Sequence, residues 1–574
     1  MSSPNPETAE SPSHISPMLR LPPEIVKTIV DQVPNSTIKN LRLTCRFYLG
    51  TVALRLDRAF ISANPRNVEV FTAIANHEVF RNKITEIIWD DALLYVRPVA
   101  PDAAEAYYYG SDDDYQDYAE EKDDACDENG IDWRGNVPGW FRKACRSNVY
   151  FLKGRSDDDL DRPSLVAREQ EASEQMPMEA SWAYYQQLVQ QQRDVLDSKA
   201  HIIALEKHIG SFPALQRIVI TPAAHGWIYN PLYETPMIRA FPRGFNYYIP
   251  RTWPLPDNTV PECNEWDEDG SDWQGFRTVT RVLAEGRDFG RVVDLRIDVH
   301  ELETGLNSRV FEKENRTLSN FEAVLARPDF THLQLDLMVD TYYRQADVYR
   351  SGLLKRALAR ASCGQGLKYL SLRTNVDTYE TDIDWYVPLT TIFTPTSYSR
   401  LQHFGLARFY VEQDDLLVLL ASLPKTLQSV ELSEIQFMDS KDSYRTLLWA
   451  IRDTLGWKER NPRPTLVVST DLPNPNPGRA IWLEHELYSF LYKDGSNPFG
   501  NDPETRAPSV IRFGFGWEKD RFDPDHKRPH VDSYDLADMG YIKHSSPRPK
   551  GRRPMPESPE PGCNWFSSDA RYLM

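Results

Sequence analysis

The chain of 574 residues has no apolar run long enough to cross a membrane as a helix. Its longest strongly apolar stretch lies near Leu416–Leu423, whereas a membrane-spanning helix needs about 20 apolar residues. The sequence does not open with a charged segment followed by an apolar one, so we do not expect secretion. We therefore expect an intracellular protein, cytoplasmic or nuclear, with no membrane partner.

Cysteine is scarce and scattered, with six residues far apart and no CxxC pair, namely Cys45, Cys126, Cys145, Cys263, Cys363 and Cys563. This spacing argues against a disulfide framework and against a zinc cluster. The histidines also lack metal-binding spacing, because His201 and His208 have no third ligand and His485 lacks the second histidine of HExxH. We expect no metal and no cofactor.

Motifs for nucleotide binding and for nucleophilic catalysis are missing as well. The sequence contains no GxGxxG after an expected strand, no GxxxxGK[ST] and no GxSxG. The net charge of −18 argues against nucleic-acid binding through phosphate neutralisation. These absences favour a non-catalytic protein, although an enzyme whose site the sequence does not reveal stays an alternative.

Composition divides the chain into a core-forming part and polar segments. An apolar content of 41% and 14 tryptophans indicate a packed core. Residues 1–18 are rich in serine and proline, and we expect a disordered tail there. An insertion near residues 102–132 holds ten acidic residues against one lysine within Asp112–Glu128, which predicts a solvated loop.

The most informative stretch is Leu21–Phe47, which predicts two short amphipathic helices. Pro22 and Pro23 precede the first helix, where proline is tolerated, and Pro34 ends it. One face of this helix carries apolar residues every four positions, namely Ile25, Ile29 and Val33. Ser36 or Thr37 is the expected cap of the second helix, whose apolar positions are Ile38, Leu41, Leu43, Cys45 and Phe47. Fewer than about 40 residues rarely bury enough surface to fold alone, so this unit needs a partner.

The order of residues in this stretch resembles the F-box, the module that docks substrate receptors onto the Skp adaptor of cullin-RING ubiquitin ligases. The pattern is matched without a gap at Leu21, Pro22, Glu24, Ile25, Ile29, Pro34, Leu41, Arg42, Cys45 and Arg46. The chain departs from it at Val26, Val33, Thr37, Ile38 and Thr44. The spelling NLRLTCRFY is also similar to the F-box proteins of filamentous fungi.

The resemblance implies a three-helix F-box-like module over residues 19–65 and a receptor role without catalysis. It implies contact with the Skp adaptor, and through it with cullin, by Leu21, Pro22, Glu24, Ile25, Ile29, Val33, Pro34, Leu41, Leu43, Cys45 and Phe47. The other partner would be a protein substrate of unknown identity, and neither nucleic acid nor membrane is expected. The alternative is an ordinary helical hairpin that packs on the main core or caps it.

A dispersed repeat follows, with the pattern apolar-x-x-apolar-x-apolar. It occurs at Ile84-Ile87-Trp89, Leu215-Ile218-Ile220, Val292-Leu295-Ile297, Phe330-Leu333-Leu335, Leu367-Leu370-Leu372, Leu401-Phe404-Leu406 and Leu427-Val430-Leu432. Helical patterns lie between the strands or follow the last of them, at Phe276–Glu285, Leu318–Arg327, Leu353–Ala361, Asp414–Leu423 and Ser443–Leu455. A strand followed by a helix, repeated at this length, predicts parallel strands with helical crossovers.

The predicted fold is thus α/β, and residues 66–470 resemble an irregular leucine-rich-repeat solenoid. A single irregular α/β domain is the alternative. We also expect one long helix over Ser181–Gly210. In a C-terminal extension, residues 471–574, we expect a loop at Asp471–Gly478, a helix at Ile481–Tyr492 and a loose tail from Ser545. The aromatic stretches Ala106–Tyr109 and Trp227–Tyr233 suit either a contact surface or the core.

Overall fold

A computed structural model describes residues 20–33, 35–52, 54–95, 137–156, 162–251, 253, 263–267, 270, 272–286, 291–300, 302–339, 346–361, 366–376, 386–394, 398–472, 478–500 and 510–543. The tail of residues 1–18, the acidic insertion, Ala106–Tyr109, Pro34 and the tail from Ser545 lie outside these residues. The chain divides into two compact units, Met1–Arg58 and Ala59–Met574, and each is described by itself.

The first unit consists of three helices, α1 (Pro23–Val30), α2 (Asn35–Thr44) and α3 (Arg46–Thr51). Proline stands in the first turn of α1, as expected from its fixed φ and its missing N–H. The second helix starts at Asn35, ahead of both predicted cap residues. A small core holds the helices together and consists of Val26, Val30, Ile38, Tyr48 and Val52.

The second unit is built on an open, 13-stranded sheet. The sheet order is β1 (Arg58–Ser62), β2 (Glu86–Asp90), β3 (Arg217–Thr221), β4 (Asp294–Ile297), β6 (His332–Met338), β7 (Tyr369–Thr374), β8 (His403–Ala407), β10 (Ser429–Ser433), β12 (Thr465–Asp471), β13 (Arg479–Leu483), β14 (Trp517–Asp520) and β15 (Asp523–Pro529). From β2 to β12 the neighbours pair in parallel, and from β12 to β15 they pair antiparallel. The short β5 (Leu306–Asn307) pairs with β6, and β9 (Tyr410–Val411) pairs with β11 (Gln436–Phe437).

All seven predicted repeats form neighbouring parallel strands, and their central residues lie opposite one another in register. This ladder runs through Ile87, Ile218, Leu295, Leu333, Leu370, Phe404 and Val430. Every member is fully buried, so the ladder forms the core side of the sheet. The sequence prediction missed one further parallel strand, β12, whose Leu466 extends the ladder.

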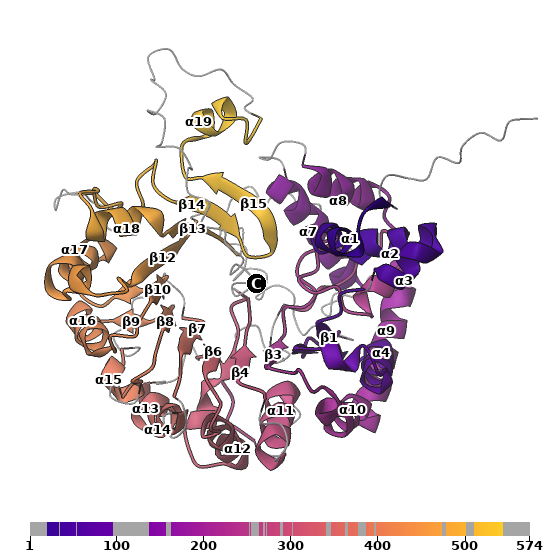
Figure 1. The fold of residues 1–574 in the computed structure, drawn as a ribbon, viewed down its shortest axis with the longest axis horizontal. Coiled ribbons are helices and arrows are strands. Elements are labelled where there is room, and N and C mark those ends of the chain that lie inside the picture. Colours follow the sequence, from indigo (N-terminus) through magenta and orange to yellow (C-terminus); the bar gives the residue numbers. More distant parts are fainter. Residues whose placement is uncertain are drawn as a thin grey trace, which may run out of the picture. The chain divides into compact units, whose positions relative to one another are not determined.

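Helices connect these strands and line the outside of the curved sheet, whose strands lie on the inside (Figure 1). The five predicted helices are present as α11 (Gln274–Glu285), α12 (Arg316–Leu325), α14 (Leu353–Arg360), α16 (Gln413–Ser422) and α17 (Tyr444–Thr454). Each of these helices has a row of buried residues and a less buried opposite side, as expected for amphipathic crossover helices.

The remaining helices are α4 (Pro65–Asn76), α7 (Gly139–Ser156), α8 (Pro163–Ser173), α9 (Met178–Ser198), α10 (Ala200–His208), α13 (Ala346–Arg350), α15 (Leu389–Ile392), α18 (His485–Tyr492) and α19 (Ser533–Asp538). Short 3₁₀ turns lie at Arg81–Lys83, Ile209–Ser211, Ile238–Ala240, Ser308–Phe311 and Trp457–Glu459. The single helix predicted for Ser181–Gly210 is wrong, because Lys199 adopts a left-handed conformation with φ 54° and separates α9 from α10. A helix cannot continue through such a residue.

The C-terminal prediction also needs correction. The predicted helix Ile481–Tyr492 begins only at His485, because its first residues belong to β13. The antiparallel hairpin of β14 and β15 was not predicted. The sheet therefore begins at Arg58, ahead of residue 66, and continues to Pro529, well beyond residue 470.

Candidate docking surface on the N-terminal unit

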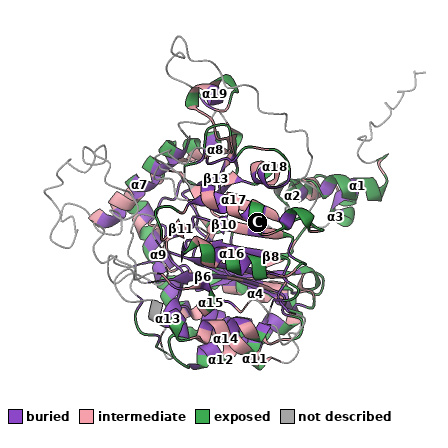
Figure 2. Cartoon of the chain, turned by 90° about the vertical axis from the view of Figure 1, so that its left-hand side faces the viewer, coloured by how far each residue is buried: buried purple, intermediate pink, exposed green. Residues whose placement is uncertain are grey.

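The first unit leaves large apolar side chains in solvent. The exposed fractions are 47% for Ile25, 39% for Ile29, 86% for Leu43, 36% for Phe47 and 53% for Leu49. Figure 2 shows α1 and α3 largely in the colour of exposed residues. We call Ile25, Ile29, Leu43, Phe47 and Leu49 the docking surface.

The sequence of α1 explains why this helix has two apolar sides. Val26 and Val30 are spaced by four and point into the small core. Ile25 and Ile29 have the same spacing one position earlier, so they form a second apolar row beside the buried one. Full burial of a side chain of this size contributes about 1.5–3 kcal/mol, so this row offers a partner a substantial gain.

Eight of the eleven sequence-predicted contact residues fall into two groups. Ile25, Ile29, Leu43 and Phe47 are exposed, whereas Leu21, Val33, Leu41 and Cys45 are half-buried and pack against the core of the unit. Sequence reasoning missed Leu49, which follows the predicted stretch, although its apolar side chain two residues after Phe47 was a usable signal.

Two predicted contact residues, Pro22 and Glu24, lie at the start of α1 and stabilise its first turn. Pro22 is the N-cap, and its carbonyl oxygen accepts from the amides of Ile25 at 3.0 Å and Val26 at 3.1 Å. Glu24 is exposed in the first turn, where a negative charge is favourable. Its carbonyl oxygen accepts from the Thr28 hydroxyl at 3.0 Å.

Polar contacts fix the arrangement of the three helices. The Arg55 guanidinium donates to the carbonyl oxygens of Asp31 and Val33, at the end of α1. The side chain of Asn35, at the start of α2, exchanges two hydrogen bonds with the Arg55 backbone at 2.6 and 3.0 Å. The segment after α3 thus holds the turn between α1 and α2.

Thr44, the most polar departure from the F-box pattern, has a local partner. Its hydroxyl donates to the Leu41 carbonyl oxygen at 2.7 Å, in the last turn of α2. The substitution of a hydroxyl for an apolar group therefore leaves no unsatisfied donor at the surface.

Two strongly perturbed titratable groups of the second unit, Asp90 and His225, lie at and just after the ends of β2 and β3. Burial raises the pKa of Asp90 to about 8, although its carboxylate accepts from the amide of Ala92 at 3.1 Å. Burial lowers the pKa of His225 to about 3, and His225 Nδ1 lies 2.7 Å from the Tyr247 hydroxyl. These three side chains have exposed fractions of 2–5%, so they lie in the core rather than face solvent.

The histidines considered as metal ligands in the sequence are not arranged to bind a metal ion in the structure. His201 Nε2 lies 2.9 Å from the side-chain oxygen of Gln274, and its ring packs against Trp89. Throughout the residues that the structure describes, no group of three or more His, Cys, Asp or Glu side chains is placed to hold a metal ion. Within the same residues, no helix has both the length and the apolar character needed to cross a bilayer.

Comparison with known proteins adds no relative. No protein family model matches the chain, and no curated protein sequence matches it.

Proposed function

We propose that this chain is a substrate receptor of a cullin-RING ubiquitin ligase. In this proposal the first unit binds the Skp adaptor, and the second unit holds a protein substrate. The observation that carries the proposal is the second apolar row of α1, because Ile25 and Ile29 stay exposed on a unit that already has its own core. These are also positions at which the sequence matches the F-box pattern.

The second unit supports the receptor role by its architecture. Strands in register with helical crossovers are compatible with an irregular leucine-rich-repeat-like solenoid. On the face opposite the buried ladder, the strands carry polar and aromatic residues at equivalent positions, namely Asp294, His332, Tyr369, His403 and Ser429. A receptor of this kind contributes proximity, since it raises the local concentration of substrate near an enzyme bound elsewhere in the complex.

The direct test is binding of a purified Skp adaptor to the full chain by calorimetry. The Ile25→Asp/Ile29→Asp double variant places two charges in the docking surface. Hot-spot residues contribute about 2 kcal/mol each, so we expect a loss of affinity of at least about 30-fold. The matched control is Val418→Asp, since Val418 on α16 is an exposed apolar residue of the second unit, with an exposed fraction of 62%. Equal affinity of the double variant and the wild type would overturn the proposal.

A second measurement distinguishes adaptor docking by the N-terminal helices from a purely structural role in which these helices cap the sheet. All 14 tryptophans lie in the second unit, so tryptophan emission follows the unfolding of that unit by itself. Deletion of Leu21–Phe47 should leave its cooperative transition in place under the docking proposal. If the helices only capped the sheet, the deletion would abolish that transition, because terminal elements of repeat arrays shield apolar ends.

A further inference from the structure

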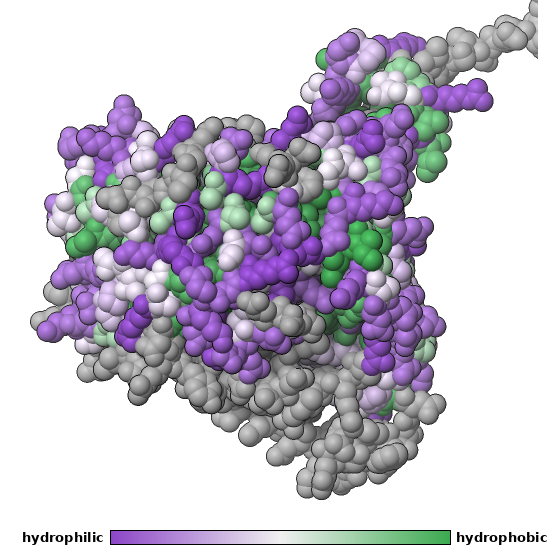
Figure 3. Space-filling model, turned by 90° about the horizontal axis from the view of Figure 1, so that it is seen from below, coloured by the Kyte–Doolittle hydropathy of each residue, from purple (hydrophilic) through white to green (hydrophobic). Residues whose placement is uncertain are grey.

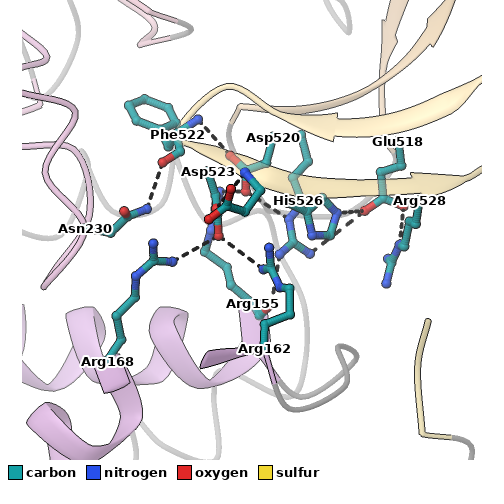
Figure 4. A network of polar contacts seen from close by, with 12 residues as sticks. Arg155, Arg162, Arg168, Asn230, Glu518, Asp520, Phe522, Asp523, His526 and Arg528 are labelled. Atoms are coloured by element: carbon teal, nitrogen blue, oxygen red, sulfur yellow. Dashed lines mark hydrogen bonds and ion pairs between the residues drawn. The ribbon is translucent and has the colours of Figure 1, made fainter. Parts of the chain in front are cut away.

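The turn between β14 and β15 is held by a buried group of charged and aromatic side chains (Figure 4). The turn sequence is Asp520-Arg521-Phe522-Asp523, with a carboxylate at each end. Its partners come from residues 155–300 and from β13, so most lie more than 200 residues away in sequence. The turn and its partners all belong to the second unit.

Guanidinium groups contact both carboxylates. Asp520 pairs with Arg155 at the end of α7 and with Arg479 Nε of β13 at 3.1 Å, and its side chain is fully buried. Asp523 Oδ2 lies 3.2 Å from Arg162 Nη2 and 3.0 Å from Arg168 Nη1, at the start and within α8. Charge-assisted hydrogen bonds of this kind are roughly twice as strong as neutral ones.

Between the carboxylates, Phe522 occupies an aromatic environment. Its ring meets Trp227 edge to face at a centroid distance of 5.9 Å and His300 at 5.1 Å. Its carbonyl oxygen accepts from the Asn230 side chain at 2.8 Å. Trp227, which the sequence left open between surface and core, has an exposed fraction of 6%.

Arginines also pack on the ring of Trp227. The guanidinium of Arg155 lies 4.4 Å from the ring centroid and that of Arg251 lies 3.8 Å from it. Such contacts fix the guanidinium planes and favour bidentate recognition of carboxylates. In a chain with a net charge of −18, this is a local cationic and aromatic site.

The turn belongs to the terminal piece of the sheet. In the part of the chain that the structure describes, β15 pairs with β14 alone, and β14 joins the rest through four residue pairs with β13. Terminal pieces of this kind open at a lower free energy than the central strands. The turn therefore combines tight side-chain contacts with a strand pairing to the sheet on one side alone, to which Arg521 adds a backbone hydrogen bond to Gly478 at 2.8 Å and an ion pair with Glu431 at 3.6 Å.

We propose that Asp520–Asp523 is an internal occupant of a binding site, and that this site takes an acidic segment of a partner protein when the hairpin leaves. The partner segment has an aromatic residue between two carboxylates. Arg155, Arg162 and Arg168 bind its carboxylates, and Trp227 packs against its ring. The inference is independent of adaptor docking, since no residue of the first unit takes part.

The test uses a fluorescent peptide with the sequence of Trp517–Pro529 and measures its anisotropy with the full chain. In the wild type the tethered turn competes at a high effective concentration, so binding should be weak. The Asp520→Asn/Asp523→Asn variant weakens the internal contacts, and its affinity for the peptide should rise at least tenfold. Adding Arg162→Gln and Arg168→Gln should remove this gain. A peptide with both aspartates replaced by asparagine is the matched control and should not bind.

Hydrogen exchange of residues 510–543 shows whether the hairpin opens in the double variant. Faster exchange without tighter peptide binding would overturn the proposal, because the site would be open and still not bind the peptide. Unchanged exchange would also overturn it, because the charges of Asp520 and Asp523 would then not hold the turn. If the double variant fails to fold, Phe522→Ala replaces it and the same two criteria apply. Binding of the asparagine control peptide with equal affinity would also overturn it.

Discussion

The two units differ in how completely they bury their apolar side chains. Of the thirteen large apolar residues exposed in the described chain, five lie in the first unit and eight in the much longer second unit. In the view of Figure 3, hydrophilic residues cover most of the described surface, and apolar residues form smaller patches between them. Exposure that is concentrated in a small unit is what the docking proposal requires.

The difference has a geometric cause. A unit of three short helices has a high ratio of surface to volume, so one side of α1 is enough to fill its core. In the second unit, helices cover the apolar face of each strand and neighbouring strands continue the same ladder. Apolar residues there find partners on several sides, and only isolated positions stay exposed.

The largest expected effect comes from breaking the ladder at Leu370 in β7. This residue is fully buried and lies between Leu333 and Phe404. Leu370→Ala should lower the free energy of unfolding of the second unit by about 2–5 kcal/mol, because it removes buried contacts and leaves a cavity. Urea unfolding followed by tryptophan emission measures the loss.

Ser371→Ala is the matched control, since the next residue of the strand points to the other face. Adaptor binding by the first unit should be the same in both variants. A loss below about 0.5 kcal/mol for Leu370→Ala, the size of an ordinary surface substitution, would contradict the role of the ladder.

An intermediate effect is expected from Asp90 and depends on pH. Because burial raises its pKa in the folded state to about 8, the folded chain keeps a proton that the unfolded chain has lost above about pH 4. This group therefore contributes less stability as the pH rises towards 8. Between pH 6.5 and 8, wild type should lose up to about 2 kcal/mol of unfolding free energy relative to Asp90→Asn.

Between pH 6.5 and 8, the effect of Asp90 on stability can be distinguished from that of His225. The lowered pKa of His225 has the opposite effect on stability, but that effect is complete by about pH 6.5, the ordinary value of a histidine. Urea unfolding of the wild type and of Asp90→Asn at several pH values in this range gives the change of the unfolding free energy with pH. Parallel profiles for wild type and Asp90→Asn would show that Asp90 is already ionised in the fold.

The smallest effect on stability is expected from substitutions of exposed apolar residues, and these substitutions compare the two units directly. Leu43 in the first unit and Val418 in the second are both exposed, by 86% and 62%. Replacement of either by Gln should change the unfolding free energy by less than about 0.5 kcal/mol. Only Leu43→Gln should weaken adaptor binding, and equal binding by both variants would remove the distinction between a docking surface and scattered exposure.

The sequence predicted the parallel strands well because their signal is local. Each copy carries apolar residues at the spacing of a strand whose one face is buried, and Leu333 or Leu370 needs no distant information to be assigned. The break at Lys199 was missed for the same reason, since the apolar spacing continues on both sides and no glycine marks the left-handed residue.

The docking surface and the last hairpin were less predictable because distant contacts decide them. Periodicity placed Ile25 and Ile29 on one helix face, but it did not show that Val26 and Val30 would take the core. The strand β15 has no apolar alternation at all, and its first residue, Asp523, pairs with Arg162 and Arg168, more than 350 residues earlier in the chain. No local sequence pattern predicts ion pairs between residues so far apart in the chain.

The composition of β15 has a consequence for how copies of this protein behave in crowded solution. Edge strands with free amides can recruit a strand of another molecule and start a growing stack. Pro524 and Pro529 have no amide hydrogen to offer, and Asp525 and Lys527 place charges on the same strand. At the β15 end, the sheet is thus a poor template for the addition of a strand from another chain.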